Sequence, residues 1–445
     1  MPMKFAIHTL GCKVNTYESD LMVQQMKAAG FAQVPFEEAA DVYLINTCTV
    51  TNIADRKSRQ MLHRAKAKNP DALIVAAGCY ANAVEQGKGL PEESVDLWVF
   101  NKEKSRIAEL VHEKLCKLNK TPAAEKDAWQ KGLFLTELDG HTRAFVKIQD
   151  GCNQFCSYCI IPYVRGRITG RPVEDTLNEA RKLAERGVTE IVLTGIHLTS
   201  LGEDLLRTME GLEQVEGIRR VRLGSLEPRL ITTEFIETIG KYQKLCHHFH
   251  LSLQSGSDTV LKKMNRHYTA AEYAAGCDLI RKAWPDAAIT TDIIVGFPRE
   301  TEEEFRETLA FAKRVGFYEA HVFKYSRRKG TVADRMDGQL TEAVKTERSN
   351  RLMALCDEMS HDYRSRFLGK SVTFLYEETV TADGKDCLTG FTPEYVRCLL
   401  PVSAASAAAS ASLIDASTPV PGALITGKAA GLVTVKNMGE CLLLE

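Results

Sequence analysis

The sequence predicts an α/β protein in three parts: an N-terminal parallel α/β domain, a central partial (β/α)6 barrel and a small C-terminal all-β module. Short β-rich runs alternate twice with helical patterns, and such alternation is typical of parallel sheets covered by helices. After Gly369 the pattern changes to short strands with turn residues, which predicts the third part. We place the parts at residues 1–118, 141–368 and 369–445, with a polar linker at 119–140.

The composition excludes several classes of protein. The chain has 445 residues, 44% of them hydrophobic, and a formal net charge of −1. No run of about 18 uncharged apolar residues occurs, so we expect no membrane-spanning helix. The N-terminus lacks the pattern of a secretion signal, and we expect a cytoplasmic protein. The 13 cysteines should then be reduced, and those at ligand spacing indicate a metal or cluster site.

In the N-terminal part, three strands alternate with two helices. We expect strands at Lys4–Leu10, Asp41–Thr47 and Ala72–Ala77, and helices at Tyr17–Ala29 and Asn52–Lys68.

The central part has six strands in series, which favours an open or partial barrel, with a doubly wound sheet as the alternative. The expected strands are Ala144–Ile148, Glu190–Thr194, Arg220–Gly224, His248–Leu253, Ile289–Val295 and Glu319–Phe323. The expected helices are Glu174–Arg186, Thr232–Ile239, Ala270–Lys282 and Glu302–Val315, followed by a long helix at Leu340–Phe367. In the C-terminal module we expect strands at Ser371–Tyr376 and Tyr395–Leu400, and a loop over the low-complexity segment Ser403–Ser412.

The sharpest motif is Cys152-x3-Cys156-x2-Cys159, which follows the first strand of the central part. Active sites of α/β barrels lie at this carboxyl end. A 4Fe–4S cluster held by the protein alone needs four thiolates, and three would leave one iron open for another ligand. A buried helical stripe of cysteines and a zinc site are the alternatives.

Three further cysteines each follow a predicted strand directly: Cys12, Cys48 and Cys79. Because the carboxyl ends of adjacent parallel strands converge, these three thiols could meet at one point. Three such thiolates would again suit a cluster with one free iron, and three unrelated buried cysteines are the alternative.

Two resemblances extend this interpretation. The cysteine triplet, with Tyr158 before its last cysteine, resembles the loop of the radical S-adenosylmethionine (SAM) superfamily. The blocks TLGCKVN, NTCTV and AGCYA around the three single cysteines resemble those of the methylthiotransferases, as do QDGCNQFCSYCIIPYVR, LTGIHL, QSGSD and VGFP. Members of that family that act on threonylcarbamoyladenosine in tRNA are the most similar, and the family usually ends in a β module called TRAM.

The resemblance implies two 4Fe–4S clusters, one held by Cys152, Cys156 and Cys159 and an auxiliary one held by Cys12, Cys48 and Cys79. It implies SAM as cofactor, an electron donor such as flavodoxin or ferredoxin, and a sulfur donor that the sequence does not identify. The reaction would be methylthiolation at C2 of N6-threonylcarbamoyladenosine, at position 37 next to the anticodon of tRNA. Candidate SAM contacts are Tyr158, Gly195, Ser225 and Gln254.

For RNA binding, the predicted helix after Cys48 carries a net charge of +5 over Asp55–Lys68, and Arg327-Arg328-Lys329 is a second, weaker candidate. From Gly369 onward, five basic residues face eight acidic ones, which argues against a strongly RNA-binding TRAM module. Phe374, Tyr376 and Tyr395 could stack on bases, although core packing is their expected role.

Two functional alternatives stay open. One is another methylthiotransferase substrate, either isopentenyladenosine in tRNA or an aspartate of a ribosomal protein. The other is a non-catalytic iron–sulfur or zinc RNA-binding protein.

Overall fold

A computed structural model describes residues 2–118, 120, 134–136, 142–404 and 420–445. The predicted linker at 119–140 and the low-complexity segment Ser403–Ser412 therefore lie mostly outside the described residues. No helix in the described ranges combines the length and apolarity needed to cross a bilayer.

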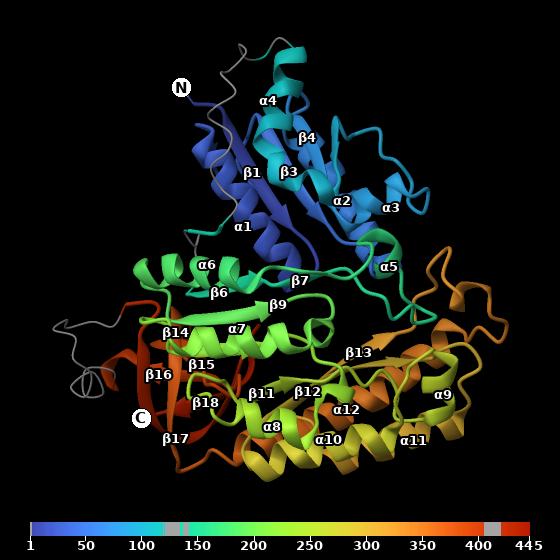
Figure 1. The fold of residues 1–445 in the computed structure, drawn as a ribbon, viewed down its shortest axis with the longest axis vertical. Helices are drawn as coiled ribbons and strands as arrows, with labels where there is room; N and C mark the ends of the chain where they lie inside the picture. Colours follow the sequence, from blue (N-terminus) through green and yellow to red (C-terminus); the bar gives the residue numbers. More distant parts are fainter. Residues whose placement is uncertain (1, 119, 121–133, 137–141, 405–419) are drawn as a thin grey trace.

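The N-terminal part is a five-stranded parallel sheet in the order β2-β1-β3-β4-β5 (Figure 1). Its strands are β1 (Lys4–Thr9), β2 (Ala32–Gln33), β3 (Val42–Thr47), β4 (Leu73–Gly78) and β5 (Leu97–Val99). Its helices are α1 (Lys13–Ala28), α2 (Asn52–Lys68), α3 (Cys79–Glu85) and α4 (Ile107–Lys117). Strands β3 and β4 are buried along their whole length, as a parallel sheet with helices on both faces requires. The three predicted strands and two predicted helices are confirmed, and β2, β5, α3 and α4 are additional.

The central part holds six parallel strands in sequential order. Its two three-stranded sheets, β6-β9-β10 and β11-β12-β13, are joined by isolated bridges such as Leu226 to Leu251. The strands are β6 (Arg143–Lys147), β9 (Glu190–Thr194), β10 (Arg220–Leu223), β11 (His248–His250), β12 (Ala288–Val295) and β13 (Glu319–Lys324). This order is that of a partial barrel. The doubly wound alternative is wrong, because its strand order would reverse at a switch point.

Helices cover the outside of the barrel. They are α6 (Val173–Glu185), α7 (Glu203–Glu213), α8 (Thr233–Ile239), α10 (Ala270–Ala283) and α11 (Glu302–Val315). Shorter elements near the strand ends are β7 (Gln149–Asp150), α5 (Ile161–Val164), β8 (Thr169–Gly170) and α9 (Asp258–Lys263). The sequence prediction missed α7, although its leucines at positions 205 and 212 lie in the core. The long helix α12 (Glu342–Ser365) follows the barrel, as predicted.

The C-terminal part is a closed barrel in the order β14-β15-β16-β18-β17. Its strands are β14 (Ser371–Ala382), β15 (Lys385–Phe391), β16 (Arg397–Pro401), β17 (Leu424–Val435) and β18 (Gly439–Leu444). Phe374 and Tyr376 are buried in its core, so they are not exposed for base stacking. Tyr395 precedes β16 in a turn with a φ of 69°, rather than starting a strand as predicted.

The C-terminal barrel is anchored on the amino end of the central barrel. Arg222 of β10 is fully buried and donates hydrogen bonds to the carbonyl oxygens of Thr392 and Pro393 at 3.2 and 2.7 Å. The neighbouring Tyr395 ring reaches the His248 ring, with 5.2 Å between centroids. The turn after β15 therefore closes the amino end of the barrel interior.

Candidate functional site

The three single cysteines come together at the carboxyl edge of the N-terminal sheet. Cys12 follows β1, Cys48 follows β3 and Cys79 begins α3 after β4, and these three strands are neighbours in the sheet. All three side chains line one cavity of about 800 Å³. Gly78 is required at this edge, because a Cβ there would lie 2.3 Å from the Thr47 carbonyl oxygen. The expectation that the three thiols meet agrees with this arrangement, and we call them the auxiliary triad.

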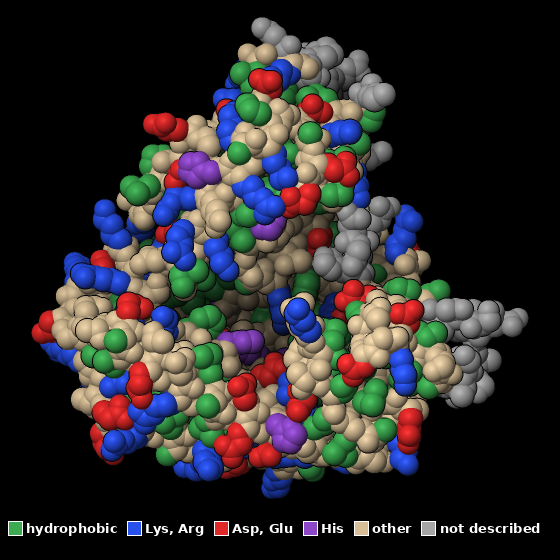
Figure 2. Space-filling model, turned by 180° about the vertical axis from the view of Figure 1, so that it is seen from behind, with side chains coloured by type: hydrophobic (Ala, Val, Ile, Leu, Met, Phe, Trp, Pro, Cys, Tyr) green, Lys and Arg blue, Asp and Glu red, His purple; other side chains and the backbone are tan. Residues whose placement is uncertain are grey.

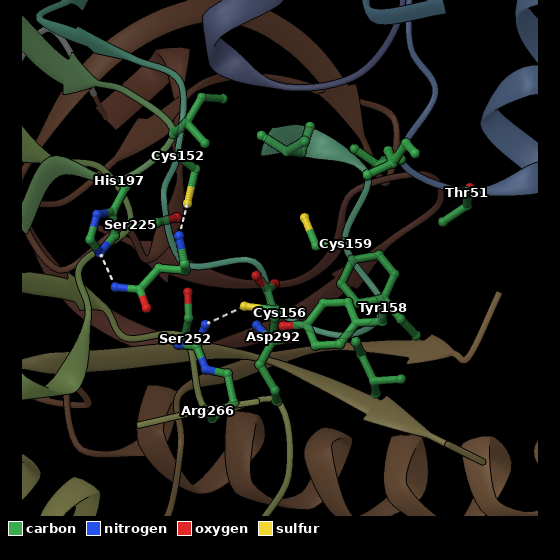
Figure 3. A pocket seen from close by; sticks show the side chains of 18 of the residues that line it. Thr51, Cys152, Cys156, Tyr158, Cys159, His197, Ser225, Ser252, Arg266 and Asp292 are labelled. Carbon is green, nitrogen blue, oxygen red and sulfur yellow. Dashed lines mark hydrogen bonds between the residues drawn. The ribbon is translucent and has the colours of Figure 1, made fainter. Parts of the chain in front are cut away.

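The cysteine triplet lines an adjoining cavity of about 310 Å³ (Figure 3). The segment is a loop without helix, so the interpretation as a buried helical stripe is wrong. Ser157, in the middle of the loop, holds it in place through hydrogen bonds with Met264, Lys263 and Ala333 at 2.7–2.9 Å. We call Cys152, Cys156 and Cys159 the barrel triad.

The two cavities share part of their walls. Residues that line both are Val50, Ile161, Ile196, Ser225, Ser252, Asp292 and Phe323. Seen from behind, the molecule is hollowed between the N-terminal part and the barrel (Figure 2). The auxiliary triad and the barrel triad thus face a common space, one from each part of the chain.

Cationic side chains donate hydrogen bonds to one sulfur of each triad. The Arg266 guanidinium lies 3.2 Å from Cys156 Sγ, and Arg165 Nε lies 3.2 Å from Cys79 Sγ. Burial raises the pKa of Cys48 and of Cys159 to about 12, so as free thiols these cysteines would be protonated and poor nucleophiles. A bound metal would deprotonate a coordinating thiol outright, so burial does not prevent these cysteines from acting as ligands.

The number and spacing of the thiols bear on whether a triad suits an iron–sulfur cluster or a single metal ion. In the described part of the chain, one group of three potential ligand side chains has all its ligand atoms within 4.8 Å: His250, Asp292 and His321. Neither cysteine triad is that compact. A zinc ion needs sulfurs at about 2.3 Å from one centre, whereas a cubane spreads its ligands more widely. Each triad also offers one thiolate fewer than the four ligands of a structural zinc site, which matches a cubane with one open iron.

Comparisons with known proteins agree with this geometry. Residues 146–312 match the model of the radical SAM superfamily, and residues 4–99 match an uncharacterized protein family, UPF0004. A threonylcarbamoyladenosine tRNA methylthiotransferase (MtaB) of Bacillus subtilis is 41% identical over 88% of this chain and 89% of its own length. The chain belongs to the methylthiotransferase family.

Other relatives of the methylthiotransferase are named for one of two activities on tRNA. The MtaB of Aquifex aeolicus is 39% identical over 84% of this chain and 93% of its own length. A tRNA-2-methylthio-N(6)-dimethylallyladenosine synthase of Caldicellulosiruptor saccharolyticus is 36% identical over 84% of this chain and 82% of its own length. Among solved structures, the radical SAM methyltransferase TsrM of Kitasatospora setae has a TM-score of 0.53 at 14% identity, covering 73% of this chain and 72% of its own. That likeness supports the fold alone.

The predicted SAM contacts of the methylthiotransferase lie in different places. Tyr158, Ser225 and Gln254 line the cavity of the barrel triad. Gly195 lines the cavity of the auxiliary triad instead, and a Cβ on it would lie within 3.0 Å of Leu198 and Gln149 side-chain atoms. Its packing against these residues accounts for the glycine without a ligand, and its role as a SAM contact stays a prediction.

A polar network lies beside Cys152. Its Glu227 belongs to the segment 225–228, which is expected from the sequence to face the SAM crevice, whereas His197 and Gln154 are not among the predicted contacts. His197 Nε2 lies 3.0 Å from Glu227 Oε2, and Gln154 Nε2 donates to the same oxygen at 3.0 Å. Burial would raise the pKa of Glu227, but the His197 hydrogen bond and the Arg266 charge hold it below its usual range. His197 follows β9, so a search for polar residues after each barrel strand could have found it as well. Arg266 follows helix α9 rather than a barrel strand, so the same search would not have found it.

The two basic candidates for RNA contact differ in the structure. Arg328 is buried and paired with Asp55 at 2.7 Å, so it joins the barrel to α2 and is not free for phosphate. On α2, four of the six basic side chains pair with acidic neighbours: Arg59, Arg64, Lys66 and Lys68. Arg56 and Lys57, at the start of α2, are exposed. The exposed basic side chains of this helix that have no ion pair within the described residues therefore lie in its first turns.

Proposed function

We propose that this chain methylthiolates C2 of N6-threonylcarbamoyladenosine at position 37 of tRNA. The observation that carries the proposal is the common space faced by two cysteine triads from different parts of the chain. A relative named for this activity is 41% identical over most of the chain. This function places the protein in the cytoplasm with its tRNA substrate.

We further propose that each triad holds a 4Fe–4S cluster. Bound at the barrel triad, SAM and its cluster would supply a radical that removes hydrogen, and the auxiliary cluster would supply the transferred sulfur. A reductant such as flavodoxin or ferredoxin is required, and the sulfur donor is not assigned.

The chain's own residues would orient the reactants and exclude water. The N-terminal part contacts the barrel near its carboxyl end through buried ion pairs, including Arg328 with Asp55 and Arg165 with Glu18. The apolar side chains of Val50, Ile161, Ile196 and Phe323 line both cavities. Such a wall limits the access of water to reactive species formed between the triads.

The experiment compares two triple variants of the anaerobically reconstituted protein. Replacement of Cys12, Cys48 and Cys79 by Ala should abolish the methylthio product on a modified anticodon hairpin, while reductive SAM cleavage persists. Replacement of Cys152, Cys156 and Cys159 should abolish both reactions. The iron content should fall from about eight to about four atoms per chain in each variant, since each 4Fe–4S cluster holds four iron atoms. Eight irons in the first variant would contradict the assignment of the second cluster.

Other relatives are named for activity on N6-dimethylallyladenosine, which is therefore the second candidate substrate. Mass spectrometry of hairpins that carry each modified nucleoside decides between the two. Turnover of the dimethylallyl hairpin alone would contradict the proposed substrate.

A further inference from the structure

Polar side chains line the inner wall of the barrel below the two triads. Alternate residues of a strand face the same side, and the cavity-lining positions are His248 and His250 on β11, Thr290 and Asp292 on β12, and Glu319 and His321 on β13. In the strand register, His250 lies opposite Thr290, and Asp292 lies opposite His321. The cavity that receives the auxiliary triad is therefore polar on its barrel side.

Hydrogen bonds fix the centre of this wall. His250 Nδ1 lies 3.0 Å from Thr290 Oγ1, and its Nε2 lies 3.3 Å from Asp292 Oδ2. Because both ring nitrogens are engaged, His250 is held in place and orients the Asp292 carboxylate. Burial would raise the pKa of Asp292, but the hydrogen bond from His250 and the nearby His321 hold it below its usual range. The site therefore presents an ionised, oriented acceptor.

Ring nitrogens of two histidines on this wall lack partners within the described residues. His248 is 5% exposed, and its Nδ1 makes no hydrogen bond within the described residues. An unpartnered buried polar atom destabilises the site, and a polar ligand would recover that loss. No hydrogen bond of His321 is found in the ranges that the structure describes, and its ring is exposed to the cavity. Lys13, from the N-terminal part, lines the same cavity, and its ammonium lies 5.9 Å from the centre of the Tyr395 ring.

We propose that His321, Asp292, His248 and Lys13 form the subsite for the N6 substituent of the adenosine, with His250 as the positioning residue for Asp292. The inference rests on the proposed function and adds the residues that select the substrate. A threonylcarbamoyl group carries a carboxylate, a ureido carbonyl, N–H groups and a hydroxyl. The imidazoles and the ammonium match its acceptors, and Asp292 matches its donors. An apolar dimethylallyl group would leave these buried polar groups unpaired, which is a strong basis for rejection.

The test measures binding of anticodon hairpins to the reconstituted holoenzyme. Two hairpins differ only in the nucleoside at position 37, which is N6-threonylcarbamoyladenosine or adenosine. The wild-type protein should prefer the modified hairpin by about tenfold or more, as expected for charge-assisted hydrogen bonds. The ratio of affinities for the modified and unmodified hairpins should fall close to one in His321→Leu and in Asp292→Asn. His321→Gln keeps a hydrogen-bond donor and should retain part of the preference. His361→Leu, on the outer helix α12, is the matched control and should keep the full preference.

Three outcomes separate the inference from the function on which it rests. Unchanged preference in both variants would overturn the subsite, and if product still forms, the proposed function survives. Preference without any methylthio product would support the subsite and contradict the proposed function. A stoichiometric zinc ion found in the wild type and lost in Asp292→Asn would overturn the subsite in favour of a metal site. Iron content equal to that of the wild type shows that a variant is folded.

Discussion

Arg165 Nε lies 3.2 Å from Cys79 Sγ, and this contact joins the two halves of the candidate site. Arg165 follows α5, the short helix after the loop of the barrel triad, whereas Cys79 belongs to the auxiliary triad. The same guanidinium, with a fully buried side chain, donates to Asn15, Glu18 and Asp150 at 2.7–3.1 Å. A single side chain thus fixes how the radical SAM loop sits against the auxiliary cysteines.

Substitution of Arg165 should change the auxiliary cluster more than the barrel cluster. Hydrogen bonds to cluster sulfurs raise the reduction potential, so Arg165→Lys should lower the potential of the auxiliary cluster. Lysine keeps the positive charge but cannot satisfy the acceptors that the planar guanidinium reaches. A redox titration followed by electron paramagnetic resonance measures the shift. Arg266→Lys is the matched control, because Arg266 donates to Cys156 and should shift the other cluster. Equal potentials in Arg165→Lys and the wild type would contradict this role.

Arg222 should be the principal anchor of the C-terminal barrel. It is fully buried, and its guanidinium bonds Glu190 at 3.1 Å as well as two carbonyls of the turn before β16. Removal of one partner of a buried ion pair costs about 3–5 kcal/mol, so Arg222→Leu should lower the free energy of unfolding by that amount. Urea unfolding checks the value. Arg207→Leu, which removes an exposed pair with Asp204, should cost at most about 1 kcal/mol. A similar loss in both variants would contradict the anchoring role.

The ionisation of Glu190 should make the stability of the folded protein depend on pH in the acid range. Burial would raise its pKa, but Arg222, Arg143 and Arg220 outweigh this and hold the pKa below its usual range. A depressed pKa in the folded state contributes stability above the unfolded value of about 4.3, and this contribution is lost as pH falls through the folded pKa. Glu190→Gln should therefore melt at a lower temperature than the wild type at pH 7, and the difference should shrink below pH 4. A constant difference from pH 7 to pH 3 would show that the charge of Glu190 is not the cause.

Local patterns were enough to predict the strands that carry the cysteines. Each triad follows strand ends, and the strand-end rule alone placed Cys12, Cys48 and Cys79 on neighbouring strands. Long-range pairing was not predictable in this way. The sequence indicates only a basic surface residue at Arg328, because its partner Asp55 lies in a distant segment of the chain. Nothing near Tyr395 in the sequence indicates that its turn closes the barrel beneath His248, because that contact depends on the packing of two separate parts.

RNA binding should depend on the first turns of α2. Arg56 and Lys57 are exposed there, and the four later basic residues are paired with acidic neighbours. The double reversal Arg56→Glu and Lys57→Glu should weaken binding of an anticodon hairpin. Each lost phosphate contact should also reduce the slope of log affinity against log salt by about 0.7 to 0.9. Lys313→Glu with Arg314→Glu, an equally exposed basic pair on α11, is the control and should leave both quantities unchanged. Equal loss in both double variants would mean that net charge, rather than a defined surface on α2, governs binding.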